Sequence, residues 1–312
     1  MQIEAAQSLV LAALAVHYPA TPAVLETLNA GRPGHPSFVF RAQMAADHFV
    51  VAKLTQPALL AAYANRLMAV HPGMAQGPYR VPEPLFYDAG LGLLLMEDTW
   101  GQRGDVLLVK DADAAARVLD KAGAWIARFH RLTRFQAAFN PDPHVNWIRK
   151  AIAGHKSGLR PIPDCEGLRA LLPDLDALAE DARGGMVSRA ITHRDFHLRN
   201  LLIRKQGRSY GIDFENAGRD ECIRDLLFFL ADCAKVQTAT PTQASLRATA
   251  QALRQSYGQP LGDAAVRRFF QVAFAMAAWA GLEDGTPPGP KRRRTIEVIQ
   301  MLTQADDLFA DP

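Results

Sequence analysis

The spacing of apolar residues along the chain changes near residue 100. Before that point, apolar residues come in short runs rich in Val, Phe and Leu, and Gly or Pro bounds several of them, which is typical of strands. These runs predict strands at residues 37–41, 49–54, 84–87 and 92–96. One helical stretch, residues 57–70, interrupts the strands, and Pro57 suits its first turn because no amide donor is needed there.

After residue 100 the apolar positions repeat at helical spacing, most clearly in the segment 111–132. Similar patterns predict four further helices, at residues 168–181, 244–257, 264–280 and 294–309. Among these helices, residues 200–203 and 209–212 predict two short strands joined by a polar turn at Gly207. The chain is therefore predicted to be α+β, with a small sheet-rich part followed by a larger, mainly helical part that contains a short hairpin.

The composition is that of a globular protein with a sizeable core, with 49% apolar residues, 21% charged residues and a net charge of +3. So small a net charge predicts neither a nucleic-acid partner nor a membrane-surface partner.

The apolar run at residues 9–16 could imitate a signal peptide, but the leader carries Glu4 and no Lys or Arg, which favours a helix. No apolar run reaches the roughly 18 residues that a membrane-spanning helix needs. The cysteines form no CxxC pair, which predicts free thiols and a cytoplasmic location.

The segment ITHRDFHLRNLLI, residues 191–203, places many polar groups between two apolar runs. A zinc site formed by His193 and His197 is one interpretation, since four-residue spacing can put two imidazoles on one helix face. However, the glutamate of the helical zinc pattern is missing, and the segment runs into a predicted strand. A structural polar turn is a second interpretation, because Asp and Asn side chains often satisfy backbone groups.

Phosphoryl transfer is the third interpretation, and Asp195, Asn200 and Asp213 together favour it. This chemistry needs a carboxylate that orients or deprotonates the attacking hydroxyl, and oxygen ligands that hold Mg²⁺ on the nucleotide phosphates. One carboxylate and one amide carbonyl are suitable ligands because Mg²⁺ prefers hard oxygen donors. The predicted hairpin separates Asn200 from Asp213 and can fold both onto one ion, while Asp195 on the preceding loop can face the substrate.

HRDFHLRN followed by IDFE resembles the catalytic loop and metal-binding strand of the aminoglycoside phosphotransferase and choline kinase family, the small-molecule relatives of protein kinases. The resemblance implies a bilobal, protein-kinase-like α+β fold, with a small sheet-rich nucleotide-binding N-lobe at residues 1–98. A larger, mainly helical C-lobe at residues 99–312 would carry the catalytic loop and the acceptor site. ATP and Mg²⁺ are the implied cofactors, with Asp195 as catalytic base and with Asn200 and Asp213 as Mg²⁺ ligands.

The same resemblance implies supporting roles around the loop. His193 would brace the loop and would not shuttle protons. Arg194 stands where many family members have Gly, and its side chain either pairs with a neighbouring carboxylate or is solvated. Asp225, just ahead of LLFFL, would brace the loop backbone, with a helix-surface carboxylate as an equal alternative. Glu215 could reach the metal or a substrate group.

Two features of the first hundred residues could serve nucleotide binding. Gly31 and Gly34 lie in AGRPGHPSFVFRA, a flexible turn whose amides could approach phosphates, although an ordinary hairpin turn also explains them. Lys53 lies in the apolar strand HFVVAKL, where burial without an anionic partner is costly, and the resemblance implies contacts with the α- and β-phosphates. The family pairs this lysine with a glutamate on the following helix, but residues 54–81 contain no Asp or Glu. Asn65, or an acid from elsewhere, would have to take that place.

The run LGLLLMEDTWG resembles the strand that leads into the hinge between kinase lobes. Backbone groups at Met96, Glu97 and Asp98 would then bind adenine. Met96 is equally explained as a core residue, and the side chains of Glu97 and Asp98 could cap the next segment or face substrate.

The acceptor is defined only by exclusion. The last third of the chain has no dense acidic cluster of the kind that polycationic drugs require. It carries PPGPKRRRT, which places Lys291, Arg292, Arg293 and Arg294 in a loop that precedes a helix, either as a solvated surface or as a site for an anionic acceptor or headgroup. We expect a small-molecule hydroxyl acceptor such as a sugar, an amino alcohol or a related metabolite. The alternative is a nucleotide-binding pseudokinase or regulatory module without transfer activity.

Overall fold

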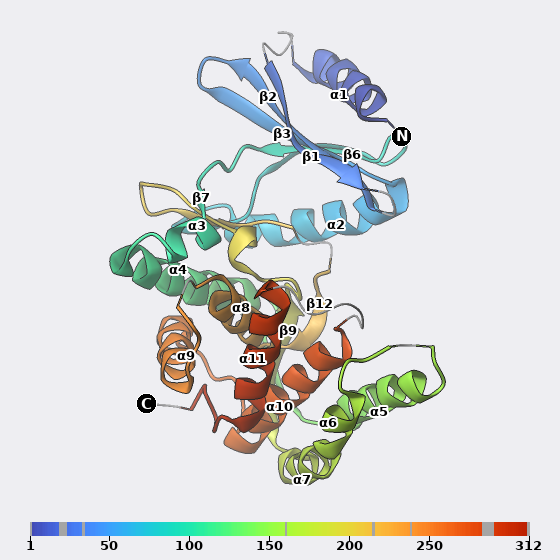
Figure 1. Cartoon of the computed structure of the whole chain (residues 1–312). Helices are drawn as coiled ribbons and strands as arrows, with labels where there is room; N and C mark the ends of the chain where they lie inside the picture. Colours follow the sequence, from blue (N-terminus) through green and yellow to red (C-terminus); the bar gives the residue numbers. More distant parts are fainter. Residues whose placement is uncertain are drawn as a thin grey trace. The chain divides into compact units, whose positions relative to one another are not determined.

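The computed structural model describes residues 2–18, 24–32, 35–159, 161–213, 216–237, 239–282 and 290–310. The chain divides into two compact units, each with its own elements (Figure 1). Unit 1 comprises Met1–Gln102 and Leu202–Ala217, and unit 2 comprises Arg103–Leu201 and Gly218–Pro312. The sequence had indicated that the hairpin around Gly207 belongs with the helical part, whereas the structure groups it with unit 1. Strand pairing explains the difference, since the second hairpin strand runs parallel to Tyr79–Arg80.

Unit 1 is built on a five-stranded antiparallel sheet in the order β1-β2-β3-β6-β5. A second sheet has the order β4-β11-β10-β7, and the unit boundary falls within β7 and β10. The elements are α1 (Ile3–His17), β1 (Val24–Arg32), β2 (His35–Ala45), β3 (His48–Leu54), α2 (Pro57–Met74), β4 (Tyr79–Arg80), β5 (Pro84–Asp88), β6 (Leu93–Glu97), β7 (Gln102–Arg103), β10 (Leu201–Ile203) and β11 (Ser209–Gly211). The four strands and the helix predicted before residue 100 are confirmed as parts of β2, β3, β5, β6 and α2.

The two faces of β3 follow from the alternation of side chains along a strand. Val50, Ala52 and Leu54 are buried in a core shared with Leu14 and other apolar residues of α1. The intervening Lys53 points to the other face, where its Nζ lies 4.4 Å from the centroid of the Tyr63 ring on α2. The strand thus builds the core with one face and presents a single cation on the other.

Unit 2 is mainly helical and includes a three-stranded antiparallel sheet in the order β12-β9-β8. Its elements are α3 (Gly104–Leu108), α4 (Ala112–Arg131), β8 (Phe135–Ala138), α5 (Asp142–Lys156), α6 (Cys165–Ala170), α7 (Leu172–Ala182), β9 (Met186–Thr192), the 3₁₀ turn η1 (Leu198–Asn200), β12 (Gly218–Glu221), α8 (Ile223–Val236), α9 (Gln243–Tyr257), α10 (Ala264–Ala280) and α11 (Pro290–Gln304). Local chemistry sets several of these ends: Asp111 accepts a hydrogen bond from the Ala114 amide at the start of α4, and Gly258 ends α9 with a φ of 60°.

The structure differs from the sequence expectation at two helices. The helix predicted at 168–181 is two helices, α6 and α7, because Pro173 in the first turn of α7 cannot continue the hydrogen bonding of α6. The last helix begins at Pro290, not at Arg294, so the basic run lies in the first turns of α11 and not in a preceding loop. Across the described ranges, no helix is long and apolar enough to cross a membrane.

Candidate functional site

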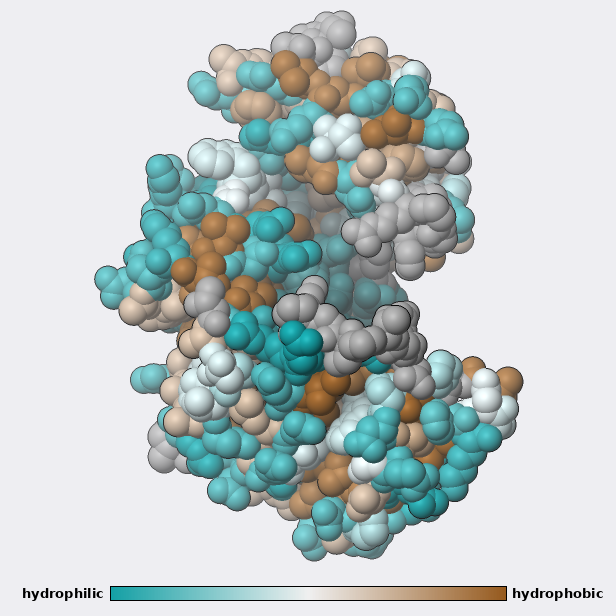
Figure 2. Space-filling model, viewed as in Figure 1, coloured by the Kyte–Doolittle hydropathy of each residue, from teal (hydrophilic) through white to brown (hydrophobic). Residues whose placement is uncertain are grey.

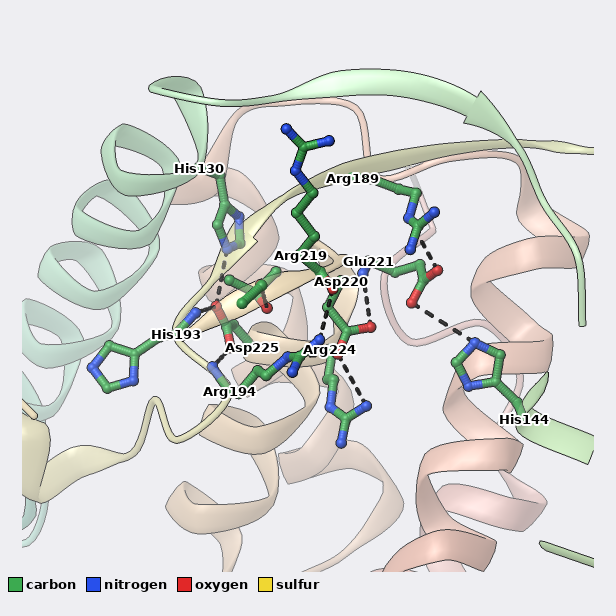
Figure 3. Close-up of polar contacts among 12 residues, drawn as sticks. His130, His144, Arg189, His193, Arg194, Arg219, Asp220, Glu221, Arg224 and Asp225 are labelled. Atoms are coloured by element: carbon green, nitrogen blue, oxygen red, sulfur yellow. Dashed lines mark hydrogen bonds and ion pairs between the residues drawn. The ribbon is translucent and has the colours of Figure 1, made fainter. Parts of the chain in front are cut away.

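The loop after β9 carries Asp195, and the buried carboxylate of Asp225 fixes its backbone (Figure 3). Asp225, in the first turn of α8, has no exposed surface. Its Oδ2 accepts a hydrogen bond of 2.7 Å from the His193 amide, and its Oδ1 accepts one of 2.8 Å from the Arg194 amide. The prediction that Asp225 braces the loop is therefore confirmed, and the helix-surface alternative is wrong.

His130 balances the charge of Asp225 inside the protein. Its Nε2 lies 3.0 Å from Asp225 Oδ2, and its Nδ1 lies 3.1 Å from the Tyr257 hydroxyl. Burial alone lowers the pKa of His130, but the nearby Cys222 and the Asp225 carboxylate outweigh burial and raise that pKa to about 9. His130 is therefore an imidazolium at neutral pH, and it neutralises a carboxylate that water cannot reach.

The two residues that precede Asp195 hold the loop in different ways. The His193 ring is fully buried among the rings of Trp125, Phe129 and Phe196, which suits a residue that braces the loop. Arg194 adopts the left-handed φ of 63°. Its Nε lies 3.1 Å from Asp220 Oδ2, so the ion pair, and not solvation, is the correct alternative for this side chain.

Asp195 keeps its carboxylate partly exposed next to this fixed backbone. Its side chain is 38% exposed, and its Oδ1 lies 3.8 Å from His197 Nε2. The His197 Nδ1 accepts a hydrogen bond from the Arg199 amide, so in the neutral ring the proton sits on Nε2, facing Asp195. The zinc interpretation of the two histidines finds no support, because the described residues contain no group of three or more His, Cys, Asp or Glu that could hold a metal.

Asn200 is oriented by the same loop. Its Nδ2 donates a hydrogen bond of 2.9 Å to the Asp195 carbonyl oxygen, and the residue is 5% exposed. Because the amide nitrogen is used in this bond, the amide oxygen is the atom left for another partner. An amide oxygen is a hard donor, so Asn200 fits the chemistry of a Mg²⁺ ligand.

In unit 1 the structure pairs Lys53 with Asp213. Lys53 Nζ lies 3.0 Å from Asp213 Oδ1, although the two residues are 160 positions apart in the sequence. Lys53 is 6% exposed, whereas the Asp213 side chain is 42% exposed. The acid missing from residues 54–81 is thus supplied by Asp213, and Asn65 is exposed on α2. The partly exposed Asp213 carboxylate can also serve as a hard oxygen donor for a metal ion.

The segment predicted to bind adenine is largely engaged within unit 1. The Glu97 amide donates a hydrogen bond of 2.8 Å to the Glu83 carbonyl, and the Asp98 carbonyl accepts one of 2.9 Å from Arg204. The Glu97 side chain accepts from the Tyr210 hydroxyl, and the Asp98 side chain pairs with Arg41 at 2.8 Å. Neither side chain caps the next segment, and Met96 is buried.

The remaining predicted residues lie apart from these contacts. Gly31 has a φ of 73°, at which a side chain would be strained, and its amide donates to the side chain of Asn29. Gly34 and Glu215 lie outside the described residues. Arg294 in α11 donates to the carbonyl oxygens of Gln237 and Ala239, so this member of the basic run is not simply a solvated loop residue.

A buried acidic pair beside the loop was missed by sequence reasoning (Figure 3). Asp220 contacts Arg194 and Arg224, both at 3.1 Å, and Glu221 lies 3.4 Å from Arg189. Burial and the neighbouring Asp220 raise the pKa of Glu221 to about 8. Burial also acts to raise the pKa of Asp220, but hydrogen bonds from Glu221 and the charges of Arg224 and Arg194 bring it below its usual range. The alternating charges of RDECIRD were the available signal.

Comparison with known proteins gives one matching family model and several similar structures. Residues 37–270 match the model described as "Phosphotransferase enzyme family". No curated protein matches the chain.

Among solved structures, the macrolide 2'-phosphotransferase MphH from Brachybacterium faecium is 16% identical, with a TM-score of 0.60 over 93% of this chain and 97% of that one. The choline kinase LicA from Streptococcus pneumoniae is 13% identical, with a TM-score of 0.58 over 96% of this chain and 99% of that one. At these identities the likeness concerns the fold, which is that of the protein-kinase-like phosphotransferases.

Proposed function

Because the chain belongs to the phosphotransferase enzyme family, we propose that it transfers the γ-phosphate of ATP to a hydroxyl group of a small molecule such as a sugar, an amino alcohol or a related metabolite. Asp195 accepts the proton of the acceptor's hydroxyl group while the hydroxyl oxygen forms a bond to the γ-phosphorus. The bond between the γ-phosphorus and the leaving ADP oxygen breaks. Asn200 and Asp213 would hold Mg²⁺, which would neutralise charge on the phosphates.

The difference in exposure between two carboxylates of unit 2 carries this proposal. Asp225 is fully buried and holds the loop backbone by binding the His193 amide. Asp195 lies two residues after His193 and keeps 38% of its side chain exposed. A general base must reach its substrate and must also be held in position, and the two carboxylates meet these needs separately.

Nucleotide binding is assigned to unit 1. Lys53 contacts the α- and β-phosphates, and in doing so exchanges its contact with Asp213 for one with phosphate oxygens. The turn with Gly31 and Gly34 is assigned to the phosphates, and adenine is assigned to backbone groups of Met96, Glu97 and Asp98 other than the Glu97 amide and the Asp98 carbonyl, which are engaged within unit 1. The three cysteines are buried and free, which suits the cytoplasmic location that we propose.

A phosphate-transfer screen with Mg²⁺ and ATP tests the proposal against sugars, amino alcohols and aminoglycosides, with products identified by mass. Asp195→Asn should slow product formation by about 10²- to 10⁴-fold and leave ATP affinity, measured by calorimetry, nearly unchanged. Asp120→Asn, an exposed carboxylate on α4, is the matched control and should retain full activity. Undiminished transfer by Asp195→Asn would contradict the proposal, and ATP binding without transfer to any acceptor would favour the pseudokinase alternative.

A further inference from the structure

Lys53 carries its charge inside unit 1. Figure 2 shows hydrophilic residues over much of the outer surface, where water solvates their polar groups. Lys53 is only 6% exposed, and its cross-strand neighbours on β2 and β6 are the apolar residues Val39 and Leu94. A buried ammonium group is costly unless protein groups stabilise it. Groups outside these three strands must therefore stabilise the charge of Lys53.

The face of the Tyr63 ring provides one such group. Helices α1 and α2 lie on opposite faces of the five-stranded sheet (Figure 1), and Tyr63 belongs to α2, on the face to which Lys53 points. Lys53 Nζ lies over this ring, 4.4 Å from its centroid. The face of an aromatic ring is negative and attracts an ammonium group, most strongly where water is excluded. Tyr63 is 2% exposed, so the contact meets that condition.

The Tyr63 ring is itself held at two points. Its backbone belongs to α2, whose residues Leu60 and Leu67 are buried with it. Its hydroxyl lies 3.9 Å from Met96 Sδ on β6, to which it donates a weak hydrogen bond. A ring held by both a helix and a strand gives the ammonium group a defined position, which matters because the four-carbon stem of lysine is flexible.

The contact with Tyr63 does not compete with a contact to an anion. Lys53 Nζ lies over the ring and also 3.0 Å from Asp213 Oδ1 in the same structure. An ammonium group has three N–H donors, so it can bind an oxygen atom and keep its contact with the ring. The Asp213 side chain is 42% exposed, so a phosphate oxygen can take its place beside Lys53 without displacing Tyr63.

We infer that Tyr63 is a positioning residue for nucleotide binding: its ring holds the Lys53 ammonium group by a cation–π contact, both before and after a phosphate replaces Asp213. The inference rests on the proposed function and deepens its nucleotide site. Because the ring is neutral, it holds Lys53 in place without cancelling the charge that a phosphate recognises.

Fluorination of the ring tests the inference, because fluorine withdraws electrons from the ring face and changes the shape of the ring little. Tyr63→Phe keeps the ring face, so its ATP affinity, measured by calorimetry with Mg²⁺, should stay within about twofold of the wild type. Pentafluorophenylalanine at position 63 should bind ATP about fivefold more weakly than Tyr63→Phe, with trifluorophenylalanine in between. Equal affinities throughout this series, or tighter binding with fluorination, would overturn the inference.

The matched control places pentafluorophenylalanine at position 40. Phe40 is also a fully buried ring of unit 1, but it lies in the core that the sheet shares with α1. ATP affinity should therefore be unchanged in this variant. A loss equal to that at position 63 would show that fluorination acts through the packing of unit 1, and would overturn the inference.

A double-substitution cycle shows whether the effect of Tyr63 passes through Lys53. Tyr63→Leu removes the ring and should weaken ATP binding about fivefold, but it should add nothing in a chain that already carries Lys53→Met. Leu67→Ala, at another buried position of α2, should have the same small effect with or without Lys53→Met. Additive losses for Tyr63→Leu and Lys53→Met would overturn the inference, because Tyr63 would then act by another route.

These experiments also separate the inference from the proposed function. If the wild type binds ATP and phosphorylates an acceptor but does not respond to fluorination, the proposed function stands and the inference fails. If the wild type binds no ATP, the proposed function fails, and urea denaturation of the position 63 series decides on the contact. A midpoint that falls with fluorination only when Lys53 is present supports the contact, and a midpoint that does not depend on Lys53 overturns it.

Discussion

Asp225 and Asp195 both act on one short loop of unit 2, but their surroundings differ completely. Asp225 has no exposed surface and has three hydrogen-bonding partners, the His193 and Arg194 amides and the His130 ring. Asp195 is 38% exposed, and its carboxylate lies at 3.8 Å from the nearby His197 ring. The comparison teaches that the loop separates two tasks: one carboxylate fixes the backbone, and another remains accessible for chemistry.

Replacing the buried carboxylate should have the largest effect. Asp225→Ala leaves two amides without their acceptor and a buried imidazolium without its counter-charge, which should cost about 3–5 kcal/mol of unfolding free energy. Urea denaturation measures this loss. Asp142→Ala, which removes an exposed partner of Arg183, is the control and should leave the denaturation midpoint nearly unchanged. Equal midpoints for the two variants would show that Asp225 does not hold the loop.

Replacing the exposed carboxylate should separate activity from stability. Asp195→Asn should lower kcat by about 10²- to 10⁴-fold, because the proposed general base is lost, without a measurable change in the denaturation midpoint. Steady-state kinetics and urea denaturation of the same preparation provide both readouts. A large drop in stability would mean that Asp195, like Asp225, is chiefly a structural residue.

The charge on His130, beside Cys222 and the buried Asp225 carboxylate, predicts a pH dependence of the unfolding free energy. Because the folded-state pKa of His130 is raised to about 9, its stabilisation is complete below its ordinary pKa of 6.5 and is lost as pH rises through 9. Relative to His130→Asn, the wild type should lose on the order of 3 kcal/mol of unfolding free energy between pH 6 and pH 10. A difference that stays constant across this range would show that His130 is neutral in the folded protein.

Replacing Lys53 in unit 1 should have the smallest effect of these changes. Lys53→Met removes the partner of Asp213, but that carboxylate is 42% exposed and can be hydrated, so stability should change little. The affinity for ATP should fall about tenfold, as expected for loss of the proposed phosphate contact, worth about 1.4 kcal/mol. Calorimetric titration with ATP measures the change, and Lys110→Met at an exposed position is the control. ATP affinity equal to that of the control would remove Lys53 from the nucleotide site.

The sequence predicted what is local. Asp195 and Asn200 lie within one uninterrupted motif, and the apolar spacing located α4, α9 and α10 because an amphipathic helix carries its pattern in consecutive residues. The role of Asp225 could be proposed as one of two alternatives. Only its burial and its two amide contacts decide between them.

What depends on distant parts of the chain could not be predicted. The Lys53–Asp213 contact joins residues 160 positions apart, and nothing near either residue indicates the other. The strands β8, β9 and β12 were not predicted: β8 and β12 have only four residues each, and the sheet forms by pairing segments that are far apart in the sequence. The burial of Asp220 and Glu221 was not predicted, because the arginines that contact them come from β9, the loop and α8 and are brought together only by the fold.

The hydrogen bonds to Asp225 also determine how fast the amide hydrogens of the loop exchange with solvent. The His193 and Arg194 amides are bound to a carboxylate that water cannot reach, so their hydrogens can exchange with deuterium only when α8 separates from the loop. This segment has no regular secondary structure, yet its amide hydrogens should exchange only when the core helix α8 moves away from the loop. The position of Asp195 is therefore as durable as the packing of α8 itself.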